Sequence, residues 1–260
     1  MSNEQINEIE EEESGLGFWD HVEELRRRII YSVVGILIGC LIAGVFIGNI
    51  MDLVLLNPAA NANLDLQNLK PFGQPFLYFK VILVVGIIFS FPFMLYQLWA
   101  FIKPALYEHE KRWVSTITFF TSLCFFVGVA FSYFVMIPSM LAFAASFGSD
   151  KIKNIIDINE YFSFLTMILL ASGILFEMPM ISFVLARFGI VTPKMLRKYW
   201  RHSVIVILII AAVITPTPDP ISQLIFAAPL FLLYEISIWV AAIGLRKRQA
   251  AEAAGDYQKA

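Results

Sequence analysis

Six stretches of the chain are nearly free of charged residues and alternate with short polar segments. Five of them contain at least 20 residues, which is the length that an α-helix needs to cross a hydrocarbon core about 30 Å thick. The stretches are Ile29–Ile50, Val81–Ile102, Trp113–Ile137, Tyr161–Ala186, Ser203–Thr215 and Ile221–Leu245. This pattern predicts an all-α, polytopic membrane protein with six transmembrane helices.

The fifth stretch is shorter than the others. A helix over Ser203–Thr215 would be about 20 Å long, and the proline-rich turn at 215–220 cannot continue it. Two alternatives remain open: helices 5 and 6 form a short hairpin that thins the bilayer, or helix 5 begins inside the preceding basic loop near Tyr199. We expect a concave bundle in which helices 5 and 6 are short.

The basic residues are distributed unevenly between the two sides of this predicted bundle. Of the 19 Lys and Arg residues, 15 lie in the terminal segments and in alternate loops, whereas only Lys70, Lys80, Lys151 and Lys153 lie on the other side. Basic residues near the ends of spans are retained in the cytoplasm. The sequence therefore predicts a multi-pass protein of the cytoplasmic (inner) membrane with both termini in the cytoplasm.

The composition agrees with a membrane protein and excludes several function classes. Mean hydropathy is +0.72, and 58% of the residues are hydrophobic. The basic residues flank spans instead of forming one patch, so we expect no nucleic-acid partner. Cys40 and Cys124 lie inside spans, and the three histidines show no metal-ligand spacing. No phosphate loop or nucleophile motif is present, so we expect neither an enzyme nor a cofactor.

Three segments follow from this pattern. Residues 1–17 include six glutamates among the first thirteen residues and predict an acidic, disordered tail. Residues 18–245 form the transmembrane domain, and 246–260 form a cytoplasmic tail. Apolar residues at Phe18, Val22, Leu25 and Ile29 predict an amphipathic helix at the membrane surface that turns into the first span.

Three polar residues lie within the predicted spans. Glu177 and Glu235 each precede the cytoplasmic end of a span by about eight residues, which places both about 12 Å from the inner edge. Gln97 lies near the inner end of the second span. Because a charged carboxylate is costly at this depth, these residues predict a polar groove within the membrane. The alternative is that they only join helices by hydrogen bonds.

Carboxylates on the cytoplasmic side have a simpler explanation. Glu23–Arg27, Glu24–Arg28 and Glu108–Arg112 are all spaced i,i+4 and can form ion pairs on exposed helix faces. From spacing alone, these carboxylates are most simply solvated surface groups.

Four segments resemble the TatC family, the receptor subunit of the twin-arginine protein translocase. They are DHVEELRRR at 20–28, YQLWAFIKPALYEHEKR at 96–112, FEMP at 176–179 and TPTPDPISQ at 215–223. The segments occur in the family's order and at matching topology, over roughly residues 18–245. The acidic tail and the Asn-rich stretch at 57–68 are not part of the family pattern.

The resemblance implies a cofactor-free receptor for signal peptides that carry consecutive arginines on folded cargo. It implies assembly with TatA- and TatB-type single-span proteins, contact with membrane lipids, hetero- and homo-oligomers, and export driven by the proton-motive force. By position, the resemblance assigns signal-peptide binding to Glu24, Glu110, Arg26 and Phe101, the membrane groove to Glu177, and partner-helix contact to Thr215, Asp219 and Gln223.

Two other functions remain open. A proton-coupled permease for a small solute would use Glu177 and Glu235 as proton carriers, although the spans show only Pro92 and Pro179 as helix breaks. A passive scaffold would need none of the carboxylates.

Overall fold

The structure is a computed structural model of the whole chain. It describes residues 3–62, 64–103, 114–146, 155–215 and 220–253. Glu110 and Asp219, two residues of the predicted sites, lie outside these described ranges.

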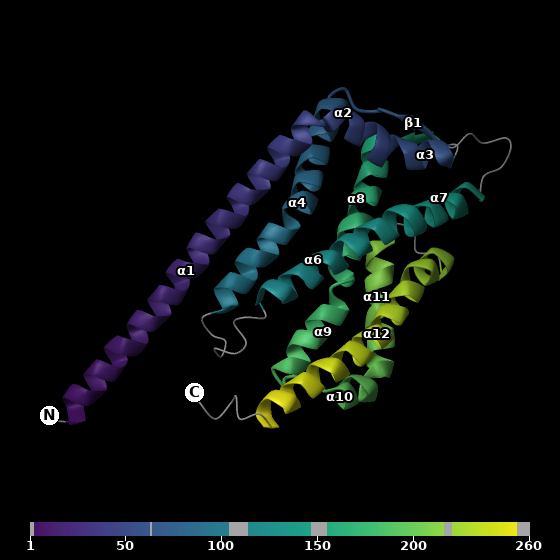
Figure 1. Cartoon of the computed structure of the whole chain (residues 1–260). Coiled ribbons are helices and arrows are strands. Elements are labelled where there is room, and N and C mark those ends of the chain that lie inside the picture. Colours follow the sequence, from purple (N-terminus) through teal and green to yellow (C-terminus); the bar gives the residue numbers. More distant parts are fainter. Residues whose placement is uncertain (1–2, 63, 104–113, 147–154, 216–219, 254–260) are drawn as a thin grey trace.

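Helices make up nearly all of the described chain (Figure 1). The long helices are α1 (Asn3–Val45), α4 (Gly73–Ile102), α6 (Val114–Phe131), α8 (Ile158–Leu175), α11 (Trp200–Ile214) and α12 (Pro220–Ala253). The shorter ones are α2 (Ile47–Ile50), α3 (Asn57–Asn61), α7 (Ile137–Ser146), α9 (Met178–Arg187) and α10 (Pro193–Lys198), with two π-helical segments, η1 (Met51–Leu56) and η3 (Ser132–Met136). Strands β1 (Asp65–Gln67) and β2 (Ile155–Asp157) pair in parallel.

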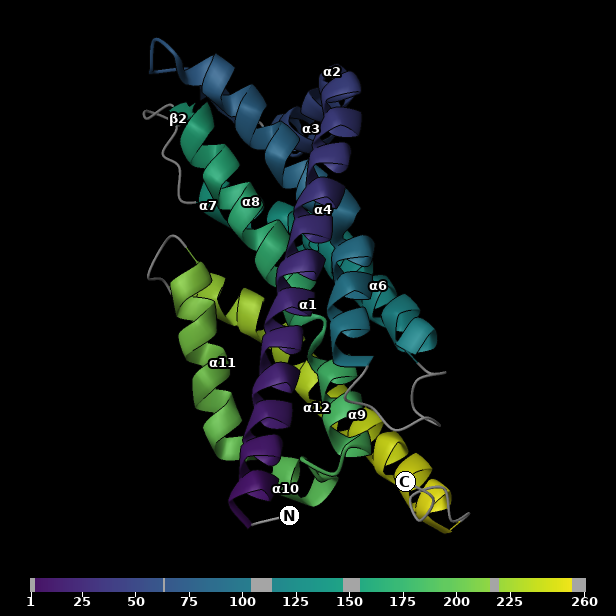
Figure 2. The same cartoon turned by 90° about the vertical axis from the view of Figure 1, so that its left-hand side faces the viewer.

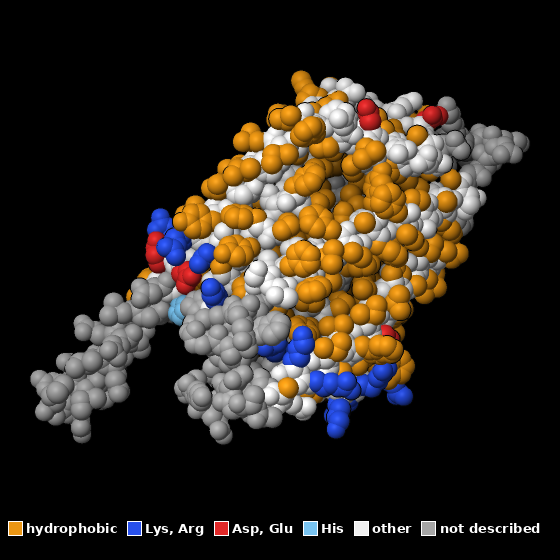
Figure 3. Space-filling model, in the orientation of Figure 1, with side chains coloured by type: hydrophobic (Ala, Val, Ile, Leu, Met, Phe, Trp, Pro, Cys, Tyr) orange, Lys and Arg blue, Asp and Glu red, His pale blue; other side chains and the backbone are white. Residues whose placement is uncertain are grey.

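The prediction of a polytopic helical membrane protein is confirmed. Within the described residues, five helical segments are long and apolar enough to cross a membrane, and α11 is a shorter apolar helix. The five are His21–Val45, Gly73–Ile102, Val114–Ser146, Ile158–Arg187 and Pro220–Ala250. Their hydrophobic side chains cover the middle of the molecule, as Figure 3 shows for one face.

Helix α1 differs from the two elements predicted for the N-terminal region. It is one continuous helix from Asn3 to Val45, so the amphipathic segment does not turn along a membrane surface. The helix also includes most of the segment for which the sequence favoured a disordered tail. Glutamate is a good helix former, and the following span supplies the nucleus from which a helix extends. The division of the chain at residue 17 stays a prediction.

The expectation of two short helices holds for α11 but not for α12. Helix α11 begins at Trp200, in agreement with the alternative that placed its start near Tyr199, and has only 15 residues. Helix α12 has 34 residues because it continues beyond the apolar stretch through Arg246–Arg248.

The beginning of α1 and the end of α12 lie at the same end of the bundle, here called the terminal end; α2, α3 and β1 lie at the opposite, distal end (Figures 1 and 2). Helix α1 lies along α4, α12 along α9, and α6 along α8. The α1–α4 crossing is close: a Cβ atom added at Gly39 would lie 2.6 Å from the backbone oxygen of Gly86. The Ser90 hydroxyl donates to the Gly35 carbonyl at 2.8 Å across the same crossing.

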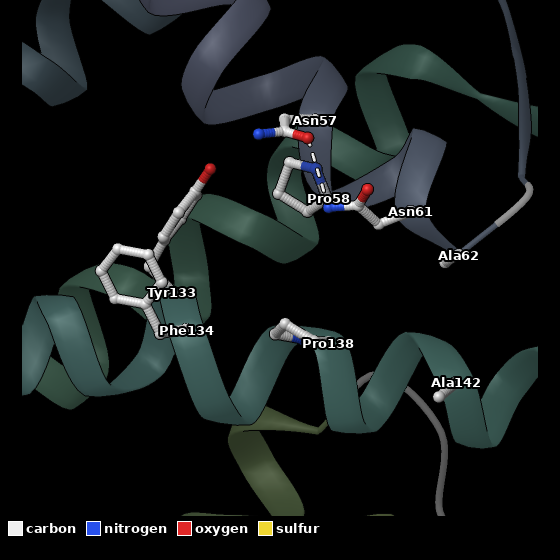
Figure 4. A pocket seen from close by; sticks show the side chains of 8 residues that line it. All are labelled: Asn57, Pro58, Asn61, Ala62, Tyr133, Phe134, Pro138 and Ala142. Carbon is white, nitrogen blue, oxygen red and sulfur yellow. Dashed lines mark hydrogen bonds between the residues drawn. The ribbon is translucent and has the colours of Figure 1, made fainter.

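The distal end is closed by short elements from three parts of the chain. Asp157 joins two of them, because it caps α8 by accepting from the Asn159 N–H at 2.7 Å and also accepts from the Leu69 N–H at 3.2 Å. These hydrogen bonds outweigh the opposing effect of burial and hold the pKa of Asp157 below its usual range. Nearby, α3 and α7 enclose a hollow of about 400 Å³ (Figure 4). Its wall includes Tyr133, whose hydroxyl donates to the Leu53 carbonyl.

Candidate functional site

A polar chain of three side chains links α1 to α4 near the terminal end. Arg28 donates from Nη2 to Oε1 of Glu24 at 3.2 Å, which confirms this predicted i,i+4 pair. The same guanidinium donates from Nη1 to Oε1 of Gln97 at 3.1 Å. Gln97 is only 5% exposed, whereas the Glu24 and Arg28 side chains are each 23% exposed. Glu24 is thus a partly buried carboxylate that solvent can still reach.

An apolar cleft of about 300 Å³ lies between α1 and α4 beside this polar chain. Arg28 and Gln97 belong to its wall, and so does Phe101, one of the residues assigned to signal-peptide binding. The remaining lining residues are Leu25, Ile29, Ser32, Phe91, Met94, Leu95 and Leu98. The cleft therefore places an apolar surface beside Arg28 and Gln97, and the Glu24 carboxylate is linked to its wall through the hydrogen bond to Arg28.

The remaining two residues of the predicted recognition surface are Arg26 and Glu110, and the structure describes only Arg26. Arg26 pairs with Glu23 at 3.5 Å, and both side chains are 71% exposed. This i,i+3 pair differs from the predicted pair of Glu23 with Arg27. Glu110 lies outside the described residues, so its proximity to Glu24 stays a prediction.

Glu177 lies at an interruption of the fourth span. Helix α8 ends at Leu175 and α9 begins at Met178, with Pro179 in its first turn. The expected opening of the backbone beside Pro179 is therefore present. The Glu177 side chain is 5% exposed, and neither carboxylate oxygen has a hydrogen-bond partner among the described residues. The backbone of Phe125 in α6 approaches the carboxylate without forming a regular hydrogen bond.

The three residues predicted to form one polar groove make separate contacts. Gln97 binds Arg28, and Glu177 has no partner of its own in the described chain. Glu235 accepts two hydrogen bonds from Arg197 of α10, at 2.9 and 3.1 Å, and 49% of its side chain is exposed. Glu235 therefore belongs to an ion pair with Arg197. A shared groove stays a prediction, with Glu177 as its buried member.

Two residues assigned to partner contact lie near the junction of α11 and α12. The Gln223 amide donates to the Leu208 carbonyl at 2.9 Å and so ties the start of α12 to α11. Thr215 is buried, and its hydroxyl donates to the Ala211 carbonyl at 2.9 Å. Asp219, the third residue of this set, lies outside the described residues.

Sequence reasoning missed the contacts that cross between helices. Arg28 and Gln97 are separated by 69 positions, and Arg197 and Glu235 by 38. Helical spacing identifies neighbours one turn apart, such as Glu24 and Arg28, but carries no signal for residues on different helices. Among the described residues there is no group of three or more His, Cys, Asp or Glu side chains that could hold a metal ion.

Comparison with known proteins gives a consistent result. The sequence model of the family described as Sec-independent protein translocase protein (TatC) matches residues 20–229. The Sec-independent protein translocase protein TatC of Deinococcus radiodurans is 38% identical over 226 residues, covering 85% of this chain and 83% of the relative. The protein of the same description from Koribacter versatilis is 39% identical over 252 residues, covering 93% and 92%.

A solved structure also matches the fold. A crystal structure of the twin-arginine translocase receptor TatC superimposes with a TM-score of 0.76 at 36% sequence identity, covering 86% of this chain and 99% of that one. The sequence resemblance to this family is therefore confirmed over most of the chain.

Proposed function

Because the chain belongs to the TatC family of Sec-independent protein translocase proteins, we propose that it is the twin-arginine signal-peptide receptor and core subunit of a translocase that exports folded proteins. The family is one of transport proteins, so the chain is not an enzyme. Its relatives favour this function over a small-solute permease, and the ion pair of Glu235 with Arg197 removes one of the two carboxylates that such a permease would use.

The observation that carries the proposal is the position of Glu24. Its carboxylate is partly buried and lies on α1, beside the apolar cleft that Phe101 helps to line. An arginine side chain presents a planar fork that can bind a carboxylate through two parallel hydrogen bonds, whereas lysine presents a mobile point charge. Glu24 binds one arginine of the signal in this proposal, Glu110 binds the other, and Arg26 lies beside them.

The assembly and its energy source belong to the same proposal. The partners are TatA- and TatB-type single-span proteins, further copies of this chain and membrane lipids, and the transport work comes from the proton-motive force. Thr215, Asp219 and Gln223 form the contact for a partner helix. Support comes from the shortness of α11, which has 15 residues and leaves little helix to cover the adjacent part of α12.

We place the chain in the cytoplasmic (inner) membrane with its terminal end in the cytoplasm. The uneven distribution of Lys and Arg residues supports this orientation. In the folded molecule, basic side chains gather at the terminal end (Figure 3). Aromatic residues lie among them, since Lys198 lies over the ring of Tyr199 and Arg201 over that of Trp200, as is typical of a membrane interface.

The test is binding of two synthetic signal peptides to the purified full chain in lipid nanodiscs. One peptide carries Arg-Arg and the other Lys-Lys at the same positions. Glu24→Ala and Glu110→Ala should together weaken binding of the Arg-Arg peptide by about 1–3 kcal/mol, given partial solvent exposure. Binding of the Lys-Lys peptide should weaken much less.

Glu23→Ala is the matched control, because it removes an equal charge from the neighbouring, exposed position on the same helix. It should leave the preference for Arg-Arg unchanged. If the Glu24 and Glu110 variants lose equal affinity for both peptides, these residues only tune surface charge. That result would contradict the proposed recognition site.

A further inference from the structure

We propose that Arg28 is an internal competitor for the carboxylate of Glu24. In the resting receptor the two side chains form an ion pair, and a signal peptide binds Glu24 only when this pair is broken. This inference rests on the proposed function, because it assumes that Glu24 receives an arginine of the peptide. It adds a residue that sets the binding threshold, and a second residue, Gln97, that retains Arg28 after the exchange.

The contact that carries this inference is the one between Arg28 and Glu24. The resting guanidinium already gives Glu24 what a peptide arginine would give it, namely a cationic hydrogen bond to Oε1 at 3.2 Å. The pair lies one helical turn apart on α1, so its members cannot diffuse away from each other. A peptide arginine that binds both oxygens of Glu24 in a fork geometry therefore competes with Arg28 for Oε1.

Gln97 explains how the replacement can occur without leaving Arg28 unbound. Its side-chain oxygen already accepts from the other terminal nitrogen of Arg28 at 3.1 Å. Gln97 is buried in the wall of the cleft, so this acceptor is held in place by packing. When Glu24 turns to the peptide, Arg28 keeps its bond to Gln97 and remains on the α4 side. The partly buried guanidinium of Arg28 therefore keeps at least one hydrogen-bond acceptor throughout the exchange, and losing both would be costly.

The consequence is a threshold that applies equally to all ligands of Glu24. If the site binds only when the internal pair is open, the apparent dissociation constant equals the intrinsic constant divided by the open fraction. An exposed or partly exposed ion pair contributes about 0.2–1 kcal/mol, which raises the apparent dissociation constant by a factor of about two to six. Strong ligands still bind at their working concentration. For weak ligands with one arginine or two lysines, the apparent dissociation constant rises further above that concentration.

The test measures both signal peptides on Arg28→Gln and Gln97→Glu variants of the full chain in nanodiscs. Arg28→Gln removes the competitor, and Gln97→Glu draws Arg28 away with a charged second acceptor. Both variants should bind the Arg-Arg and the Lys-Lys peptide about two- to sixfold more tightly, and the ratio of the two affinities should not change. A residue with a merely structural role would give weaker binding on substitution. Weaker or unchanged binding in Arg28→Gln would overturn the inference.

A charge effect is separated from competition by two controls. Arg27→Gln removes an equal charge from an adjacent position and should change binding less than Arg28→Gln. The Arg28→Gln substitution should also lose its effect in a Glu24→Gln background, because the two residues then no longer compete. If Arg28→Gln still tightens peptide binding in the Glu24→Gln background, the inference is overturned, although Glu24 can remain a recognition residue.

The proposed function itself fails by a different result. If Glu24→Gln alone leaves both peptides bound as before, Glu24 is not the recognition residue, whatever Arg28→Gln does.

Discussion

Substitutions of Glu177 can show whether this residue is kept for stability or for export, because the two are expected to change in opposite directions. Glu177 is 5% exposed and lies at the break between α8 and α9, and neither of its buried carboxylate oxygens has a hydrogen-bond partner in the described chain. An unsatisfied buried polar group destabilises a fold by about 1–3 kcal/mol. A chain selected for stability alone would place an apolar residue here. We therefore expect that Glu177 is kept for transport.

Three substitutions at this position test the expectation. Glu177→Met has nearly the same volume and removes the unsatisfied oxygens, so it should raise the free energy of unfolding by about 1–3 kcal/mol. Glu177→Ala also removes the oxygens but leaves a cavity beside α6, which offsets the gain. Glu177→Gln keeps the size and polarity of the side chain, so its stability and its export activity should be nearest to those of the parent chain.

The assays are denaturant unfolding in detergent and export of a folded reporter that carries an Arg-Arg signal. Export should fall strongly for Glu177→Met and Glu177→Ala while both proteins remain inserted in the membrane, and Glu177→Gln should be milder. A destabilised Glu177→Met protein would refute the energetic reasoning, since it would mean that the carboxylate makes favourable contacts. Full export by Glu177→Ala would refute the functional role.

Three further predictions concern other parts of the molecule. Gly39→Ala places a methyl group against the backbone of α4 and should lower the free energy of unfolding by about 1–3 kcal/mol; Gly48→Ala, where nothing lies within 4 Å, is the control and should change it far less. The pKa of Asp157 is lower in the folded state than its ordinary value, so its stabilising effect is present above a pH of about 4 and lost as the pH falls toward the folded value. The difference in thermal stability between the parent chain and Asp157→Ala should accordingly shrink below that pH, and a difference constant from pH 7 to 3 would contradict the assignment. Cysteines at Thr215 or Gln223 should crosslink to a single-span partner in membranes, whereas crosslinks confined to α1 would move the proposed interface there.

The apolar pattern predicted the helices well but predicted their ends poorly. The third span was expected to end at Ile137, yet the helix continues as α7 to Ser146. The π-helical segment η3 precedes Pro138 and widens the turn, which relieves the clash of the ring with the preceding carbonyl. Pro58 follows η1 in the same way, and both prolines face the distal hollow (Figure 4).

Features that depend on one helix alone could be determined from the sequence. Charge-free stretches indicated the spans, the spacing of Glu24 and Arg28 indicated their ion pair, and Pro179 indicated the break at Glu177. In each case the participants are a few residues apart, so the geometry of a single helix decides whether they meet. The bond between Arg28 and Gln97 and the pair of Arg197 with Glu235 depend instead on how separate helices cross. Close approach of glycine backbones sets the first of these crossings, between α1 and α4, and the spacing of residues along either helix does not specify which turns will face each other.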